Sequence, residues 1–187
     1  QIRLSKDVQR KFANLQLGDY IAGQTDRHRE NYFVDYKILD MGTGAGAVEF
    51  YITSIQGIDN DLSFGRLGGL DVLRRGVGCL PVFSDDWHLS LPFIDKGIAD
   101  RLKGLSDSSI EYIFADLLSL EEMEALKDRF KYLREARPRS FLMNDDEWNQ
   151  SSLNTTLRRS KEVPNYLSRF IDYVRDVIGS DVPIVSD

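Results

Sequence analysis

The sequence is poor in cysteine and histidine, has no long apolar run and carries no excess of positive charge. Its single cysteine, Cys79, allows no disulfide within the chain, which is compatible with a reducing compartment. No run of eighteen apolar residues occurs, so we expect no transmembrane segment. Because His28 and His88 are the only histidines, a histidine-based metal site would need both to converge, and we do not expect one.

Net charge and size exclude some classes and permit others. The net charge of −6 gives no basic footprint, so we expect no sequence-specific binding of nucleic acid, although a local basic patch over 158–161 stays open. With 187 residues, 42% of them hydrophobic, the chain can bury a core. We expect residues 1–187 to form one domain, or one lobe of a larger one. The chain begins at Gln1 without a signal-like segment, and we interpret it as a fragment.

The stretch around which the chain is organised is GDYIAGQTDRHREN, residues 18–31. Asp26 and Asn31 lie five residues apart within it, and this spacing is that of the base and the first metal ligand in phosphoryl transfer. A second acidic stretch, GIDNDLSFG, follows a strand-like run and places Asp59 after it. Carboxylate and amide oxygens are the ligands that Mg²⁺ takes from proteins, in addition to phosphate oxygens. Taken without its context, TDRHR is typical of a solvated loop with local ion pairs.

These two motifs together resemble the atypical kinases: the HipA-like toxin kinases, the phosphatidylinositol 3/4-kinases and the secretory-pathway kinases. Catalytic loops in these families read NTDRHxxN, GDRHxxN or NMDRH, beside TDRHREN here. Type II phosphatidylinositol 4-kinases pair NTDRGxxN with a later AIDNGLAF, beside IDNDLSFG here. The likeness covers about residues 18–65. The single cysteine argues against the disulfide-rich secreted members.

The resemblance implies a role for each motif residue. Asp26 would orient the acceptor hydroxyl and take its proton, while Arg27 or His28 would fix the loop or offset charge on the phosphates. Asn31 and Asp59 would hold Mg²⁺ against the phosphates of ATP. The adenine pocket and the phosphate-binding lysine would belong to an N-terminal lobe, in the same protein or on another chain. We therefore expect residues 1–187 alone to fold but to have marginal kinase activity.

The sequence leaves open both the phosphoryl acceptor, a protein or a lipid, and the activity itself. TDRH favours the protein kinases or the phosphatidylinositol 3/4-kinases, whereas IDNDLSF favours the type II phosphatidylinositol 4-kinases. No basic or amphipathic membrane-binding stretch is evident, so we favour a protein hydroxyl over a lipid. A pseudokinase or helical binding module without catalysis is one alternative class. A metal-dependent hydrolase built on Asp59, Asn60 and Asp61 is another.

The expected fold is α+β and mainly helical, the C-terminal lobe of a protein-kinase-like fold with a β-hairpin at the catalytic loop. Its catalytic core would span about residues 5–65. Apolar spacing predicts a helix from Ser5, its N-cap, to about Ala22. Strands are predicted over 32–39 and 48–55, joined by GTGAGA as a hairpin turn rather than a phosphate loop. Ile58, Leu62 and Phe64 are expected to pack beneath the site.

After an irregular, glycine-rich segment over 66–91, residues 92–180 are expected to be a helical remainder. A capping box of Ser119 and Glu122 and a terminal Gly179 mark helix ends. The predicted helices carry apolar stripes at Ile94, Ile98, Leu102 and Leu105; at Ile110, Ile113, Phe114 and Leu117; at Met123, Leu126, Phe130 and Leu133; and, after Pro164, at Leu167, Phe170, Ile171, Val174 and Ile178, with a short helix over about 146–153.

Overall fold

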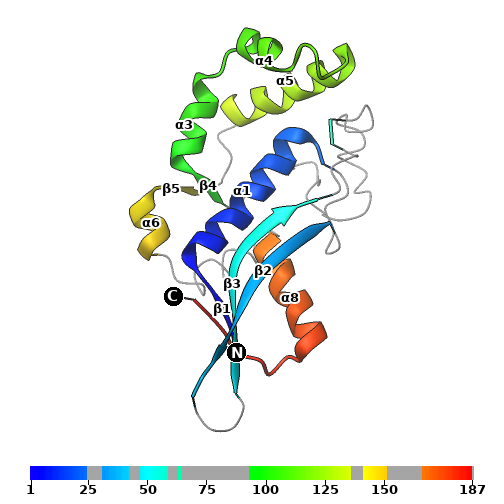
Figure 1. The fold of residues 1–187 in the computed structure, drawn as a ribbon. Helices are drawn as coiled ribbons and strands as arrows, with labels where there is room; N and C mark the ends of the chain where they lie inside the picture. The colour runs from blue at the N-terminus through cyan, green and yellow to red at the C-terminus, as the bar shows by residue number, and fades with distance from the viewer. Residues whose placement is uncertain are drawn as a thin grey trace.

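The computed structural model describes residues 1–24, 31–42, 47–58, 63–64, 93–135, 141–150 and 166–186. Helices make up about 56% of these residues and a small mixed sheet accompanies them, so the α+β class is confirmed (Figure 1). Among the described helices, none has the length and apolar character that crossing a membrane requires. The elements in chain order are β1 (Ile2–Leu4), α1 (Lys6–Ala22), β2 (Tyr32–Asp40), β3 (Val48–Gly57), β4 (Phe93–Asp95), α3 (Lys96–Gly104), α4 (Asp107–Phe114), α5 (Leu120–Glu135), β5 (Phe141–Met143), α6 (Asp145–Gln150), α8 (Tyr166–Ile178) and β6 (Ile184–Ser186).

The central sheet has the strand order β2-β3-β1-β6. The predicted hairpin of β2 and β3 is confirmed as an antiparallel pair, while β1 runs parallel to both β3 and β6. Ile2 lies opposite Phe50 and also opposite Ile184, so the first residues of the chain are a strand between two distant segments. The first strand therefore belongs to the sheet that carries the hairpin.

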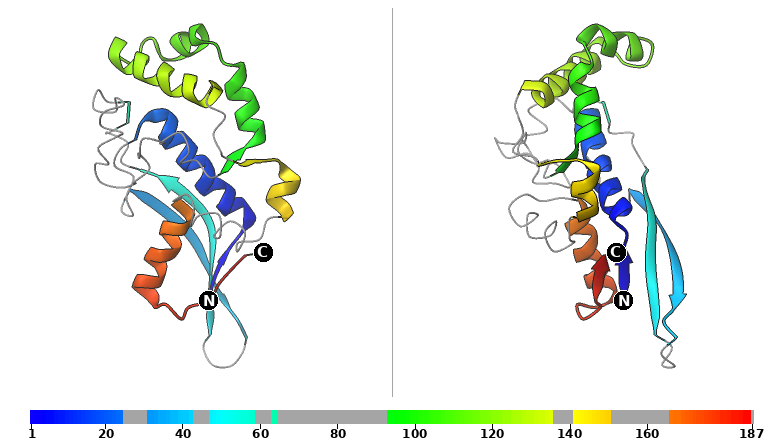
Figure 2. Two further views of the ribbon diagram at one scale, coloured as in Figure 1. Left: turned by 180° about the vertical axis from the view of Figure 1, so that it is seen from behind. Right: turned by 90° about the vertical axis from the view of Figure 1, so that its left-hand side faces the viewer.

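Helix α1 begins as its sequence predicts. Ser5 is the N-cap, and its hydroxyl oxygen accepts a hydrogen bond of 3.1 Å from the amide of Val8. The helix lies against the sheet together with α8, and both helices cover the same side of β2 and β3 (Figure 2). The buried core beneath the sheet consists of Ile2, Leu4, Val8, Phe12, Ile52, Tyr166, Leu167, Phe170, Ile171 and Val174.

A second helical layer of α3, α4 and α5 packs on the carboxyl-terminal half of α1 (Figure 1). The predicted capping box starts α5: the Ser119 amide donates to Glu122 at 2.7 Å, and the Glu122 amide donates to the Ser119 hydroxyl at 3.3 Å. Buried apolar side chains from α4 and α5 form the cluster between these helices, namely Ile110, Met123, Leu126 and Phe130.

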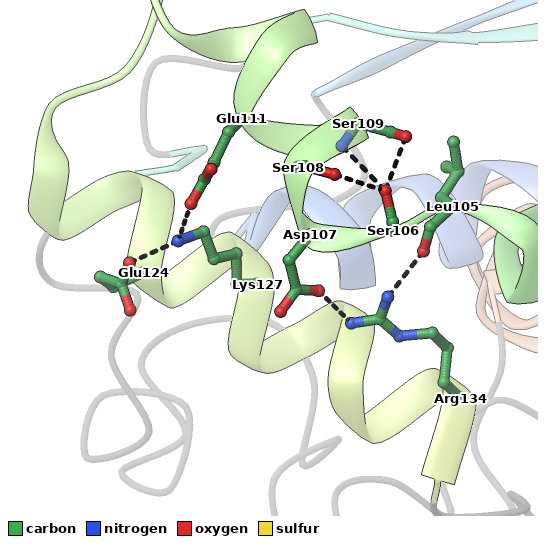
Figure 3. A network of polar contacts seen from close by, with 9 residues as sticks. All are labelled: Leu105, Ser106, Asp107, Ser108, Ser109, Glu111, Glu124, Lys127 and Arg134. Atoms are coloured by element: carbon green, nitrogen blue, oxygen red, sulfur yellow. Dashed lines mark hydrogen bonds and ion pairs between the residues drawn. The ribbon is translucent and has the colours of Figure 1, made fainter.

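Polar contacts at the surface fix α4 on α5 (Figure 3). Lys127 lies 2.5 Å from Glu111 and 2.7 Å from Glu124, and these carboxylates raise its pKa. In the last turn of α5, Arg134 donates to the carbonyl of Leu105 at 2.6 Å and pairs with Asp107 at 2.5 Å. Exposed pairs of this kind contribute little individually. Together these contacts hold α5, the helix that carries the buried Arg129, against α4.

Several expectations for the helical remainder are wrong. Ile94 belongs to strand β4, which pairs in parallel with β5, and the helix begins only after its N-cap Asp95. Leu117 lies beyond the end of α4 and is 74% exposed, so it is not on a core stripe. Ile178, the last residue of α8, is 49% exposed, so it is not on a core stripe either. Strands β4 and β5 also interrupt the segment 92–180, which was expected to be helical.

Some expectations concern residues outside the described ranges. These are the hairpin turn over 43–46, the glycine-rich segment 66–91 with Cys79 and His88, the basic residues over 158–161, and Pro164. The short helix expected over 146–153 is described as α6, which ends at Gln150. It begins with a second capping box, in which Asn144 and Glu147 exchange hydrogen bonds of 2.7 and 2.8 Å.

Candidate functional site

One predicted site residue lies within the described ranges, and the others lie outside them. Asp26, Arg27 and His28 lie in segment 25–30, and Asp59 lies in segment 59–62. Both segments are outside the described residues. Asn31 is described and is 4% exposed. The structure therefore bears on the site through the residues that flank these two segments, and each flank is fixed by backbone contacts.

The first flank is the carboxyl end of α1. Gly23 adopts the left-handed conformation with φ of 67°, its amide donates to the carbonyl of Tyr20, and the amide of Gln24 donates to the carbonyl of Asp19 at 2.9 Å. This pair of bonds is the Schellman motif, which satisfies the last carbonyls of a helix. Gln24 is buried, so the chain enters segment 25–30 from a fixed position.

Arg129 of α5 reinforces this helix end. Its side chain is 2% exposed, and its Nε donates to the carbonyl of Ile21 at 2.7 Å while one Nη donates to that of Ala22 at 3.4 Å. A cation at the carboxyl end of a helix also interacts favourably with the helix dipole. Burial lowers the pKa of Arg129 to about 10, an effect that the nearby Tyr20 and Asp128 oppose. The guanidinium remains the charged form at neutral pH.

The second and third flanks are joined by the hairpin. The amide of Ile58 donates to the carbonyl of Asn31 at 2.9 Å, one residue beyond the paired ends Tyr32 and Gly57. The described residue after segment 25–30 and the described residue before segment 59–62 are therefore hydrogen-bonded to each other.

The fourth flank returns to α1. The amide of Phe64 donates to the carbonyl of Ala22 at 2.7 Å, and Phe64 has φ of 59°, a conformation that costs free energy for a bulky side chain. Its ring packs 6.1 Å from that of Phe114 and against the cluster between α4 and α5. Phe64, which was expected with Ile58 and Leu62 to pack beneath the site, thus packs on this helical cluster as a partly buried residue, and Leu62 lies outside the described residues.

The four flanks are thus tied in two pairs. Asn31, after segment 25–30, bonds to Ile58, before segment 59–62, and Phe64, beyond segment 59–62, bonds to Ala22 at the carboxyl end of α1. Within the described ranges, no group of three His, Cys, Asp or Glu side chains gathers in a manner that could hold a metal ion. Of the two predicted magnesium ligands, Asn31 is described and Asp59 lies outside the described residues.

Two residues of this arrangement were missed by the sequence analysis. Gln24 gives no local signal, because a polar residue after a helix end is ordinarily solvated. Arg129 gives a weak one: it follows Leu126 by three residues and precedes Leu133 by four, which places a charge on the apolar stripe of α5. Its carbonyl partners are more than a hundred residues away in the chain.

Comparison with known proteins returns no relative: no protein-family model, no curated protein and no solved structure matches this chain.

Proposed function

We propose that this chain is the phosphotransferase lobe of an atypical kinase, which transfers a phosphoryl group from ATP to a hydroxyl group of a protein. One observation carries the proposal. The hydrogen bonds from Ile58 to Asn31 and from Phe64 to Ala22 each join a described flank of the segment that contains Asp26 to a described flank of the segment that contains Asp59, and this supports the proposal. The motifs TDRHREN and IDNDLSFG supply the residue types that the chemistry needs in those two segments.

In the proposed mechanism each residue has a separate task. Asp26 orients the acceptor hydroxyl and takes its proton, and a carboxylate of ordinary pKa is adequate because positioning dominates this chemistry. Asn31 and Asp59 would hold the metal, while Arg27 or His28 would offset negative charge. Bound Mg²⁺-ATP supplies the transferable phosphoryl group and the positive charge beside it. An N-terminal lobe, in the same polypeptide or on another chain, would provide the adenine pocket.

The fit of Asn31 to a metal-holding role rests on its position. Its amide oxygen is a hard ligand of the kind that Mg²⁺ accepts, and its backbone is fixed by the hydrogen bond from Ile58. Burial to 4% exposure keeps this residue out of bulk water, where electrostatic interactions are weak. Asp59 follows Ile58 directly, so an amide and a carboxylate come from neighbouring positions across the hairpin.

The test uses Asp26→Asn and Asp59→Asn, with Asp100→Asn as the matched control. Asp100 is an exposed carboxylate that pairs with Lys96 on α3, outside both predicted motifs. We expect ATP-dependent phosphorylation of protein substrates to fall more than ~100-fold in the first two variants and to be unchanged in the control. Calorimetry should show that Asp59→Asn also weakens binding of Mg²⁺-ATP, whereas Asp26→Asn leaves binding intact.

The assay is run on the chain alone and with the proposed N-terminal lobe, on lysate proteins and on phosphoinositide vesicles. Labelling of vesicles only would replace the protein acceptor with a lipid. Binding of Mg²⁺-ATP without turnover in the wild-type protein would indicate a pseudokinase. Turnover that survives both Asp26→Asn and Asp59→Asn would refute the assignment of the site.

A further inference from the structure

Strand β2 forms one edge of the central sheet. It lies at the end of the strand order, and within the described part of the chain no strand pairs with its outer side. The opposite edge is β6, which has only three residues, whereas β2 has nine. A long edge strand presents a row of backbone donors and acceptors to other chains, and proteins that stay monomeric shorten, cover or charge such an edge.

The pairing with β3 determines which backbone groups of β2 face outward. Asn31 accepts from Ile58, and the amide of Met41 donates to Ala47, so the odd-numbered positions direct their backbone groups toward β3. Val34, Tyr36 and Ile38 therefore direct theirs outward. The register shift in this hairpin skips Thr53 of β3, which leaves the alternation along β2 uninterrupted.

The side chains of β2 are unusually apolar for an edge in water. Phe33 is 64% exposed, Tyr36 is 55% exposed and Ile38 is 59% exposed. The only charged residues among positions 32–40 are Asp35, Lys37 and Asp40. Asp35 and Lys37 are exposed, and no ion pair within the described residues involves either of them. The strand thus combines unused backbone groups, exposed apolar side chains and two opposite charges on one face.

We propose that β2 pairs with β2 of a second copy of this chain, antiparallel and with Tyr36 opposite Tyr36, to form a symmetric dimer. A two-fold axis through Tyr36 sets Asp35 of one copy opposite Lys37 of the other, and does so twice. The same register sets Val34 opposite Ile38 and Phe33 opposite Leu39. Asp35 and Lys37 thus meet opposite charges, the apolar residues between positions 33 and 39 meet apolar residues, and Asp40 lies opposite Tyr32 at the ends of the strand.

The backbone agrees with this register. Val34, Tyr36 and Ile38 direct their donors and acceptors outward, and the register pairs these same residues with one another, so each pair would exchange two hydrogen bonds. Asp35 and Lys37 then occupy a non-hydrogen-bonded pair, where Cα atoms are only about 4.5 Å apart and side chains interact most closely. A shift by one residue would pair outward-facing with inward-facing positions and would lose the hydrogen bonds.

The two-fold axis would stand perpendicular to the sheet, so the sheets of both copies continue as one. Because α1 and α8 lie on one side of β2 and β3, the helices of both copies would cover the same side of the joined sheet (Figure 2). The charge pattern selects a second copy over other strands, because the sequence of β2 is complementary to itself in this one register. The central Lys37, which would blunt the edge in a monomer, here acquires a partner.

A charge-exchange series tests the proposal by sedimentation equilibrium of the full chain. We expect the wild type to dimerise with a Kd of roughly micromolar, as suits a small interface. Lys37→Asp and Asp35→Lys each place like charges opposite one another and should weaken self-association at least tenfold. An equimolar mixture of these two variants, and the double variant D35K/K37D, should recover the wild-type Kd. Circular dichroism verifies that each variant is folded.

Cross-linking provides a second measurement that does not depend on affinity. In a Cys79→Ser background, Tyr36→Cys places one cysteine of each copy opposite the other. Their Cα atoms would lie about 5.5 Å apart, a separation that a disulfide can span. Oxidation should yield a covalent dimer, whereas the same cysteine introduced at Tyr112, an exposed residue of α4, should not. A wild type that stays monomeric, or a dimer that is insensitive to the charge variants, would overturn the proposal. So would pairing of β2 with a different protein.

Discussion

The amide of Phe64 donates a hydrogen bond of 2.7 Å to the carbonyl of Ala22, which joins the second residue beyond segment 59–62 to the last turn of the helix before segment 25–30. This contact holds although Phe64 has φ of 59°, because its ring packs against Phe114 and the cluster between α4 and α5. The second helical layer thereby fixes one boundary of the proposed site.

Replacing Phe64 by Ala should therefore affect activity more than stability. We expect a loss of about 1–2 kcal/mol in the free energy of unfolding, below the 3–5 kcal/mol typical of a fully buried ring because Phe64 is only partly buried. Phe114→Ala is the matched control, since it removes the partner ring without touching the segment. The rate of phosphorylation should fall further in Phe64→Ala than in the control. Equal rates in the two variants would show that the segment does not depend on this contact.

Gly23 and Gly18, both near the carboxyl end of α1, should respond in opposite ways to replacement by Ala. Gly23 has φ of 67°, and a Cβ there would lie 2.7 Å from a nitrogen of Arg129, so Gly23→Ala should destabilise by about 1–3 kcal/mol. Gly18 has nothing within 4 Å of an added Cβ and lies inside the helix, so Gly18→Ala should stabilise by roughly 0.5–1 kcal/mol. Urea unfolding of both variants measures the difference. Similar shifts for the two would contradict the Schellman motif.

Replacing Arg129 by Met should loosen the end of α1. Met approximates the volume of the side chain but removes the donors to Ile21 and Ala22, for an expected loss of about 2 kcal/mol. Hydrogen exchange at the amides of Gly23 and Gln24 should accelerate, because the last turn would fray. Lys131→Met, an exposed substitution on the same helix, should stay within about 0.5 kcal/mol of the wild type. Unchanged exchange in Arg129→Met would refute the capping role.

The contact between Arg3 of β1 and Glu49 of β3 should make the free energy of unfolding depend on pH in the acidic range. Glu49 accepts from Arg3 at 2.7 and 3.1 Å and from Gln1, and these hydrogen bonds, chiefly those from Arg3, lower its pKa below the ordinary value of 4.5. The pKa of the folded state is thus the lower one. The contribution of Glu49 is fully present above pH 4.5 and is lost as the pH falls through the folded value.

The corresponding variant is Glu49→Gln, which cannot titrate. It should be less stable than the wild type at neutral pH, and the difference should shrink as the pH is lowered below 4.5. The free energy of unfolding is measured at intervals across that range, with Asp116→Asn, an exposed carboxylate, as the control. A difference that is constant with pH would mean that the carboxylate does not titrate differently in the folded state.

The helices and strands that have a local sequence signal were predictable from the sequence. The spacing of apolar residues and the Ser5 cap predicted α1, the alternating runs predicted β2 and β3, and the box of Ser119 and Glu122 predicted the start of α5. Each of these signals lies within a few residues of the structure that it specifies, so no distant contact is needed to find it. The candidate residues Asp26, Asn31 and Asp59 came from the same kind of local evidence.

What depends on distant segments was decided only by the tertiary structure. The three-residue strands β1 and β6 are too short to show the alternating pattern of a strand. They form strands because Ile2 pairs with Phe50 on one side and with Ile184 on the other. Arg129 is buried because α5 lies across the end of α1. The hydrogen bonds from Ile58 to Asn31 and from Phe64 to Ala22 likewise join residues far apart in the chain through backbone groups that every residue except proline carries, so no local pattern predicts them.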